Sequence, residues 1–424
     1  MLLDPSATRA LLSVLRCPAC RGQQWTTNAE RGTVACARCA RGHQVINGVL
    51  HINVLDEHPD VQQERASVPA TELSPELGGW REVFTDDTAA TSSLAQAYLS
   101  LPYGNDSAHF QEPGYFQNVQ RFAPEFDFIL RYLPTTGTLL DVGADGTWST
   151  ARLAGRGLTC VALDITDHLA LSRLFHQHGP PYSCVNVDMH DQVLADRSFD
   201  AITAFNALHH SKRLFALAAN IARMLKPDGV LGFVEPYVQN AQQEAAFGAS
   251  QSAVGINENV HALDRWDEAF HKAGLTLEAY SLTDSFNAIY RKRAERSARR
   301  PVISDFYAAE LSVTPAVVNA QAGEWVALAV HVASTGRAAW ATRGPEPTVR
   351  LSYHLACTVA GATRMVAFDN DRTWLSTFVG PGHPQDFTVQ VILDEPGSYD
   401  LTFELVHETH RWFGTPATAQ VNVE

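Results

Sequence analysis

TLLDVGADGTW, from Thr138 to Trp148, is the stretch of this sequence that decides the fold. Its first residues read as a buried strand, Gly143 and Gly146 as a tight turn, and the residues that follow as a helix. A glycine lets the backbone approach a ligand closely, and a helix N-terminus favours a ligand's carboxylate. Twenty-three residues after Asp141, the run CVALD ends in Asp164. An acidic residue at a second strand tip can accept hydrogen bonds from a ribose diol, so we expect a ribose-containing cofactor.

The glycine spacing separates two classes of such cofactor. A dinucleotide site requires G-x-G-x-x-G, and this turn lacks it. Four further runs follow in order: RLAGRGLTCVALDI (152–165), VNVDMHD (185–191), FDAITAFNALHH (199–210) and ARMLKPDGVLGFVEP (222–236). With LLDVGADG before them, they resemble the class I S-adenosylmethionine-dependent methyltransferases, particularly the branch that acts on small molecules. The resemblance implies an α/β Rossmann-like core between about Thr138 and Arg293.

The same resemblance implies which residues hold the cofactor. Asp141 and Gly143 would line the methionine end of the cofactor, and Asp164 would hold the ribose. Asp188 and Met189 would flank the adenine, and Asn206 would lie close to the sulfonium. Ala144 and Ile165 are also expected to bind the cofactor. Asp188 has an alternative role as a carboxylate that caps its own loop. The family's turn usually reads D-x-G-x-G-x-G, whereas Asp145 and Thr147 stand at the second and third glycine positions. These departures put the affinity for the cofactor in doubt and leave a cofactor-binding scaffold without activity as one alternative.

A hydroxyl acceptor needs a general base, and histidine suits that task near neutral pH. His209, after the fourth strand of the core, is the first candidate and His210 the second, although paired histidines here can simply cap a helix or pack. Glu235 and His261 are further candidates. The segment HFQEPGYF, with His109, Glu112 and Tyr115, is either a lid over the acceptor or a surface loop. No Asp-Asp-Asn constellation is evident, so we do not expect magnesium.

Two CxxC pairs lie near the N-terminus. Cys17 and Cys20 form the first and Cys36 and Cys39 the second, with fifteen residues between them, a spacing typical of zinc sites. Four thiolates give the closed tetrahedral shell of a structural zinc; a metal-free ribbon is the alternative. The runs LLSVLRCPAC and VACARCARGHQVINGVLHI resemble the small zinc-ribbon family that includes the activator subunit of tRNA and release-factor methyltransferases.

The composition and the pattern of apolar residues change along the chain and divide it into five segments. We expect a zinc ribbon over 1–55, a helical or irregular cap over 56–137, the core over 138–293, a linker over 294–301 and an all-β sandwich over 302–424. The last part has short alternating strands broken by Gly and Pro, which is typical of an immunoglobulin-like module. Runs such as VRLSYHL and PGSYDLTFELVHETHRWF resemble modules attached to bacterial surface-glycan enzymes. Four tryptophans there are either platforms for sugar rings or packing residues: Trp325, Trp340, Trp374 and Trp412.

Composition bounds the function further. The formal charge of −14 argues against nucleic acid as a general partner. No apolar run reaches the length of a membrane span, and no signal peptide is evident, so we expect a cytoplasmic protein; an oligomer stays open. The sequence therefore predicts an S-adenosylmethionine-dependent enzyme with a structural zinc that O-methylates a bacterial glycan or glycosylated metabolite. A non-sugar natural product is the second reading, and RNA or protein, recognised by the ribbon, is the third.

Overall fold

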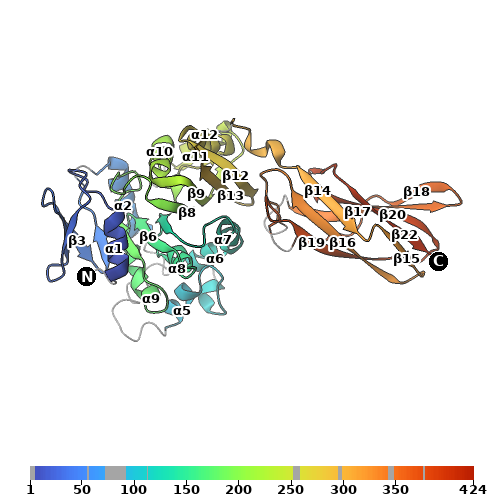
Figure 1. The fold of residues 1–424 in the computed structure, drawn as a ribbon, viewed down its shortest axis with the longest axis horizontal. Coiled ribbons are helices and arrows are strands. Elements are labelled where there is room, and N and C mark those ends of the chain that lie inside the picture. The colour runs from blue at the N-terminus through green and yellow to red at the C-terminus, as the bar shows by residue number, and fades with distance from the viewer. Residues whose placement is uncertain are drawn as a thin grey trace. The chain divides into compact units, whose positions relative to one another are not determined.

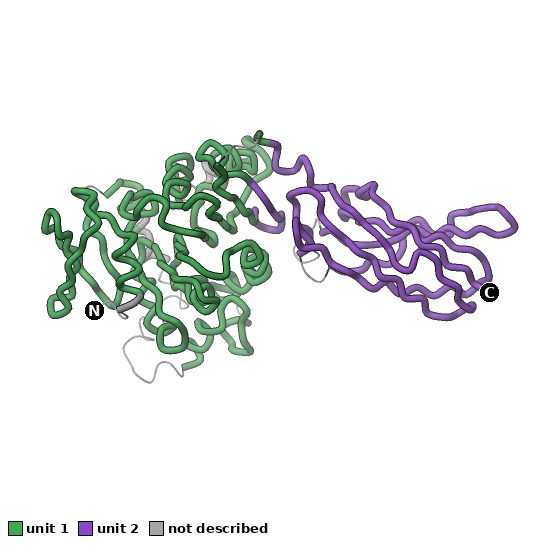
Figure 2. The backbone as a smooth tube through the Cα atoms, viewed as in Figure 1, with its two compact units in different colours: residues 1–276, 287–299 green, residues 277–286, 300–424 purple. Residues whose placement is uncertain are grey.

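The computed structural model describes residues 5–54, 57–71, 92–111, 113–251, 258–294, 298–341, 348–375 and 378–424. The chain forms two compact units, coloured separately in Figure 2. Unit 1 comprises Met1–Thr276 with Asn287–Arg299, and unit 2 comprises Leu277–Phe286 with Arg300–Glu424. The boundary therefore crosses a β-hairpin as well as the segment between 294 and 301. Among the described residues, no helix is long and apolar enough to cross a membrane.

Unit 1 is built on an eleven-stranded sheet (Figure 1) of order β1-β2-β3-β4-β7-β6-β5-β8-β9-β13-β12. Its strands are β1 (Trp25–Asn28), β2 (Thr33–Cys36), β3 (Gly42–Ile46), β4 (Val49–His51), β5 (Thr138–Val142), β6 (Thr159–Asp164), β7 (Ser183–Asn186), β8 (Phe199–Phe205), β9 (Leu225–Glu235), β12 (Leu275–Leu282) and β13 (Phe286–Lys292).

The middle of this sheet is parallel. β5 pairs with β6 on one side and with β8 on the other, and β7 and β9 extend the two sides in the same direction. These strands are almost continuously buried, as expected for a parallel sheet covered on both faces. The predicted parallel α/β core is confirmed. The strand order reverses at β5, and ligands of such sheets bind where the order reverses.

Helices and short turns connect the strands. The helices in the described residues of unit 1 are α1 (Pro5–Val14), α2 (Pro59–Thr71), α5 (Ser93–Ser100), α6 (Tyr115–Gln120), α7 (Ala123–Leu130), α8 (Trp148–Ala154), α9 (Ser172–His176), α10 (Leu214–Met224), α11 (Ala241–Gln251) and α12 (Leu263–Lys272). Short 3₁₀ turns are η3 (Ala108–Phe110), η4 (Asp167–Leu171) and η5 (Leu208–His210), and β10 (Tyr237–Val238) pairs with β11 (His261–Ala262). The predicted cap over 56–137 contains α2, α5, η3, α6 and α7, and residues 72–91 lie outside the described part.

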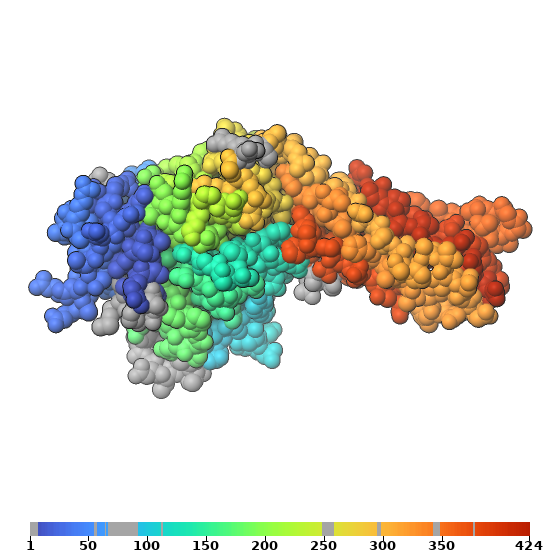
Figure 3. Space-filling view, viewed as in Figure 1, coloured from blue at the N-terminus to red at the C-terminus, as the bar shows by residue number. Residues whose placement is uncertain are grey.

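The four-cysteine segment is continuous with the central sheet. β4 pairs in parallel with β7, with Val49 opposite Cys184 and His51 opposite Asn186. The residues before the cysteines also contact the core, since the Arg16 amide donates to the Val193 carbonyl at 2.6 Å. Figure 3 shows this blue segment against the green part of the same unit. The strands of the N-terminal segment thus form one edge of the sheet that carries the core.

In the part of unit 2 that the structure describes, the regular elements are β-strands and the short η6 (Val302–Asp305). A three-stranded sheet has the order β14-β16-β19, and a second sheet has the order β15-β22-β20-β17-β18, with β21 paired to β20. β16 and β19 alternate buried and exposed residues, so one face of their sheet is in the core. The strands are β14 (Ala309–Thr314), β15 (Val317–Ala320), β16 (Trp325–Ser334), β17 (Val349–Val359), β18 (Ala362–Ala367), β19 (Gln385–Ile392), β20 (Gly397–His407), β21 (Arg411–Trp412) and β22 (Ala417–Val423).

Candidate active site

A cavity of about 440 Å³ lies in unit 1, where the carboxyl ends of β5, β6 and β8 meet. It is lined by the loops after these strands and by residues of α6, together with Phe122, two residues beyond the end of α6. The lining residues are Tyr115, Asn118, Val119, Phe122, Gly143, Ala144, Asp145, Trp148, Ser149, Leu163, Asp164, Ile165, Thr166, His168, Met189, Phe205, Asn206, Ala207, His210 and Glu258. Six of the eight residues predicted to bind the cofactor are among them.

The turn after β5 keeps the backbone of a glycine-rich loop without all of the glycines. Gly143 has φ +67°, and a Cβ on it would lie 2.2 Å from the Ala207 Cβ. Asp145 and Thr147 also have positive φ, 38° and 63°, a region that non-glycine residues adopt at a cost. The Thr147 hydroxyl forms a buried hydrogen bond of 2.8 Å with the Tyr182 hydroxyl. Both residues that stand at glycine positions of the family's turn therefore adopt the positive φ that favours glycine.

Asp164 ends β6 and lines the cavity. Its carboxylate accepts hydrogen bonds from the backbone amides of Asp145, at 2.9 Å, and Thr166, at 2.8 Å. Burial raises its pKa, and the neighbouring Asp145 carboxylate adds to that rise. One amide reaches each carboxylate oxygen, and an oxygen of this kind has a further lone pair. Asp164 can therefore also accept hydrogen bonds from a ribose diol.

Asp145, which is partly exposed, forms a pair with the buried His168 that the sequence did not reveal. His168, in η4, donates from Nδ1 to Oδ1 of Asp145 at 2.5 Å. Burial opposes ionisation of Asp145, but His168 outweighs it, so the pKa of this carboxyl is lowered. Both side chains line the cavity. A carboxylate paired with a histidine thus stands in the glycine loop and lines the cavity.

Asp141 and Asp188 do not line the cavity. Asp141 is fully buried and accepts hydrogen bonds from the hydroxyls of Ser149, Thr150 and Thr203 at 2.6 to 2.8 Å, so it joins β5 to α8 and β8. Asp188 accepts from the His190 amide at 3.1 Å and from the His190 ring at 2.9 Å. This is the loop-capping arrangement, and its neighbour Met189 is the residue that lines the cavity.

His209, the first candidate base, is buried and has both ring nitrogens engaged. Nδ1 donates to Glu235 at 2.7 Å, and Nε2 lies 2.9 Å from Glu258. Burial disfavours a charged ring, but the two carboxylates outweigh it and raise the pKa of His209 to about 9. Glu235 is fully buried and also accepts from the amides of Ala207 and Leu208, at 2.9 and 2.7 Å. Glu235 and His209 therefore organise the turn after β8 and do not line the cavity.

His210 and Glu258 line the cavity, in which Tyr115, Asp145, Asp164 and His168 are the other titratable lining residues. Glu258 precedes β11, and its hydrogen bond with His209 lowers its pKa. The sequence pointed to His261 as a candidate base, whereas Glu258, three residues earlier, is the residue that lines the cavity. His261 instead bonds Glu244 at 2.8 Å, away from the cavity lining.

The three residues of the candidate lid segment HFQEPGYF differ in where they lie. Tyr115, the first residue of α6, lines the cavity. His109 lies elsewhere, with its ring 5.4 Å from that of Phe116. Glu112 falls outside the described residues. Among the described residues of this segment, Tyr115 at the start of α6 is the one that lines the cavity.

The four N-terminal cysteines converge. The sulfurs of Cys17 and Cys39 are 3.6 Å apart, those of Cys20 and Cys36 are 3.5 Å apart, and all four lie within 4.8 Å of one another. Zinc–sulfur bonds of about 2.3 Å in a tetrahedron separate the sulfurs by about 3.8 Å. The donor set and its dimensions therefore fit a zinc ion.

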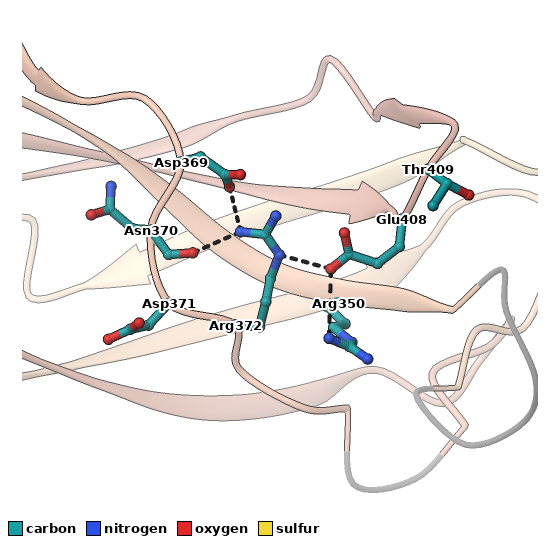
Figure 4. Close-up of a pocket in the computed structure, with 7 residues that line it drawn as sticks. All are labelled: Arg350, Asp369, Asn370, Asp371, Arg372, Glu408 and Thr409. Carbon is teal, nitrogen blue, oxygen red and sulfur yellow. Dashed lines mark hydrogen bonds and ion pairs between the residues drawn. The ribbon is translucent and has the colours of Figure 1, made fainter.

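Unit 2 has a polar pocket of about 620 Å³ (Figure 4). Arg372 is at its centre and pairs with Asp369 at 2.5 Å and with Glu408 at 2.7 Å. Its lining residues are Arg350, Asp369, Asn370, Asp371, Arg372, Glu408 and Thr409. The Arg350 guanidinium lies 4.3 Å over the ring of Trp374, which is 59% exposed.

The other tryptophans of unit 2 differ from Trp374. Trp340 is buried and donates to the Phe306 carbonyl at 2.9 Å, so it packs. Trp412 is partly buried beside His354, with ring centroids 4.4 Å apart. Trp325 is 64% exposed on β16 and does not line the pocket of Figure 4.

Comparison with known proteins identifies the class of the core. Residues 140–233 match the family model described as a methyltransferase domain. These residues contain β5, β6 and β8 with the loops that line the cavity. Unit 1 therefore carries a class I, S-adenosylmethionine-dependent methyltransferase domain.

Individual relatives are distant. The non-reducing polyketide synthase trt4 of Aspergillus terreus is 23% identical over 290 residues, which cover 62% of this chain. The match spans only 11% of that synthase's length. An S-adenosylmethionine-dependent methyltransferase from Mesorhizobium loti is 16% identical, with a TM-score of 0.35, over 40% of this chain and 98% of that one. The geranyl diphosphate C-methyltransferase of Streptomyces coelicolor is 13% identical, with a TM-score of 0.37, over 45% and 88%.

Proposed function

We propose that this chain transfers the methyl group of S-adenosylmethionine to a hydroxyl oxygen of a glycan or a glycosylated metabolite. The arrangement of Asp164, Gly143 and Asp145 around one cavity carries the methyltransferase part of this proposal. Asp164 would accept from the ribose hydroxyls, the methionine moiety would lie against the backbone at Gly143, and Asp145 would face its ammonium group. Ile165 and Met189 would lie against the adenine.

The bound sulfonium supplies an activated methyl group, and transfer from it is an in-line displacement that depends mainly on alignment. Asn206 and Ala207 line the cavity where β8 ends, with Trp148 and Phe205 beside them. An acceptor oxygen held there would attack the methyl carbon. We assign its proton to the pair formed by His210 and Glu258, because these side chains line the same cavity and His209 has both nitrogens engaged.

The pocket in unit 2 supports a sugar as part of the acceptor. All its lining residues are polar and those that carry charge are nearly balanced, three acidic and two basic, which disfavours both an apolar ligand and a polyanion. Hydroxyl-rich rings suit such planar polar groups, and their C–H faces stack on exposed aromatic rings. Trp374 and Phe368, 59% and 58% exposed, adjoin the pocket through Arg350 and Asp369. A sugar bound here would be tethered to the catalytic unit through the chain, which raises its local concentration.

A second candidate is a non-sugar natural product. Val119, Phe122, Trp148 and Phe205 give the cavity an apolar wall, and the polyketide synthase named above is a relative over more than half of this chain. Such an acceptor would need no contribution from unit 2.

An array of bacterial polysaccharides and glycosylated metabolites, incubated with the protein and S-adenosylmethionine carrying a labelled methyl group, tests the proposal. Wild-type protein should bind and label a subset of the glycans. Trp374→Ala should weaken that binding by about fivefold to tenfold, since an aromatic stacking contact contributes roughly 1 kcal/mol. Trp325→Ala is the matched control, an equally exposed tryptophan outside the pocket. Absence of labelled glycan, or equal loss in the two variants, would contradict the glycan assignment.

A further inference from the structure

Three metal-ligating side chains meet beside the methyltransferase cavity. The donor atoms of His209, His210 and Glu258 all lie within 4.8 Å of one another. His210 and Glu258 line the cavity itself. Within the described part of the chain, the four cysteines are the other group of this kind. They lie near β1 and β2, which end the strand order, whereas the cavity lies at β5, β6 and β8.

The surroundings of His209 are those of a metal ligand. Glu235 accepts from Nδ1 at 2.7 Å, and it is itself fixed by backbone amides. This carboxylate turns Nε2 toward Glu258. Histidines that bind metals characteristically donate their second N–H to such an outer carboxylate, which sets the ring's orientation and tautomer.

The spacing between donors agrees with a shared ion. Two bonds of about 2.1 Å separate their donor atoms by about 3.0 Å at the right angle of an octahedral site and by about 3.4 Å at a tetrahedral angle. The distance from His209 Nε2 to Glu258 is 2.9 Å, which is near the octahedral value and is also an ordinary hydrogen-bond length. The rings of His209 and His210 lie with centroids 4.3 Å apart. A shared proton would explain the contact between His209 and Glu258. A divalent ion would explain that contact and also the position of the His210 imidazole beside it.

We propose that His209, His210 and Glu258 bind one divalent transition-metal ion at the wall of the cavity. Two imidazoles and one carboxylate suit zinc, manganese or iron(II) better than magnesium. Three protein ligands leave coordination positions for a small oxygen ligand from the cavity. Resting on the proposed function, the ion would bind the acceptor hydroxyl and make it more acidic, and the second oxygen of Glu258 would accept the proton.

Zinc titration of the full-length protein by calorimetry, after dialysis against a chelator, tests the site. Wild-type protein should take up one more equivalent of zinc than Glu258→Gln, or bind that equivalent at least tenfold more tightly. The cysteine cluster contributes equally to both curves, so their difference reports on the proposed site. His210→Ala should have the same effect. Glu244→Gln is the matched control, because Glu244 also pairs with a histidine, His261, but belongs to no such donor group.

Binding of S-adenosylmethionine, measured on the same samples, shows that each variant is folded and keeps the outcome separate from the proposed function. Identical zinc curves for wild-type protein and for folded Glu258→Gln and His210→Ala would overturn the metal site, whatever the enzyme methylates. In that case His209 simply forms a buried ion pair with its two carboxylates.

Discussion

Three carboxylates at neighbouring strand ends have different tasks, although the sequence presents them alike. Asp141 accepts hydrogen bonds from three hydroxyls. Asp188 accepts from an amide of its own loop and pairs with Arg213, 3.3 Å away. Asp164 alone of the three lines the cavity. The difference arises from hydrogen-bond partners that lie elsewhere in the sequence: an acidic side chain already surrounded by donors has little capacity left for a ligand.

At this residue scale, Asp164→Asn should weaken S-adenosylmethionine binding by about tenfold to a hundredfold, because a hydrogen bond to a charged group contributes roughly 1.5 to 3 kcal/mol. Isothermal titration calorimetry measures the change. Asp188→Asn is the control. It should lower the Tm of the protein, because the loop loses its capping carboxylate, and it should weaken S-adenosylmethionine binding far less. Equal loss of affinity in the two variants would show that Asp164 has no special role.

At the scale of elements, the pairing of β4 with β7 makes the four-cysteine segment part of the catalytic sheet. β7 ends at Asn186, and Met189 follows within the same connection. Arg21 reinforces the arrangement by donating to the Gln192 carbonyl at 2.7 Å. Without the segment, β7 would become an exposed edge strand, which natural sheets avoid.

Cys17→Ser should therefore release zinc and also weaken the binding of S-adenosylmethionine in the cavity. We expect the loss of about one zinc per chain, a lower Tm of unit 1, and weaker S-adenosylmethionine binding through the loop that carries Met189. Metal analysis, thermal unfolding and calorimetry on the same sample measure the three effects. Cys357→Ser, a buried thiol of unit 2, should keep its zinc and its cofactor affinity. A Cys17→Ser protein that loses zinc but binds the cofactor normally would limit the cluster to a local role.

At the scale of the whole molecule, the chain forms unit 2 from two separate segments. The tip of the β12–β13 hairpin, residues 277–286, belongs to unit 2. There the Tyr280 amide donates to the Arg337 carbonyl at 2.9 Å, and the Ala339 amide donates to the Tyr280 carbonyl at 2.6 Å. The side chain of Tyr280 is fully buried.

A protein ended at Arg299 should therefore be less stable than the full chain, because its hairpin tip loses these partners and exposes Tyr280. Each kcal/mol lost lowers Tm by roughly 2 to 4 °C in a domain of 150 to 250 residues, and calorimetric unfolding measures the shift. Trp374→Ala in the full chain should leave Tm nearly unchanged. An unaltered Tm after truncation would mean that the hairpin is stable without unit 2.

The sequence by itself determined the features that depend on neighbouring residues and on strand order. A buried strand, a glycine turn and a helix follow from the local pattern of 138–148, because Gly143 must adopt a positive φ where β5 ends. The spacing of Cys17, Cys20, Cys36 and Cys39 likewise predicted four sulfurs in one cluster, since each CxxC forms a tight knuckle.

Only the tertiary structure decided which side chains face the cavity. His209 and His210 are adjacent, yet Glu235, twenty-six residues away in the sequence, holds the first inside the turn, and the second reaches the cavity. Asp145 and His168, twenty-three residues apart, form a pair that no local pattern indicated. Glu258 lies farther still, beside His209 through the packing of the segment before β11. Side-chain direction depends on partners contributed by distant strands and loops, and those partners meet only once the sheet has formed.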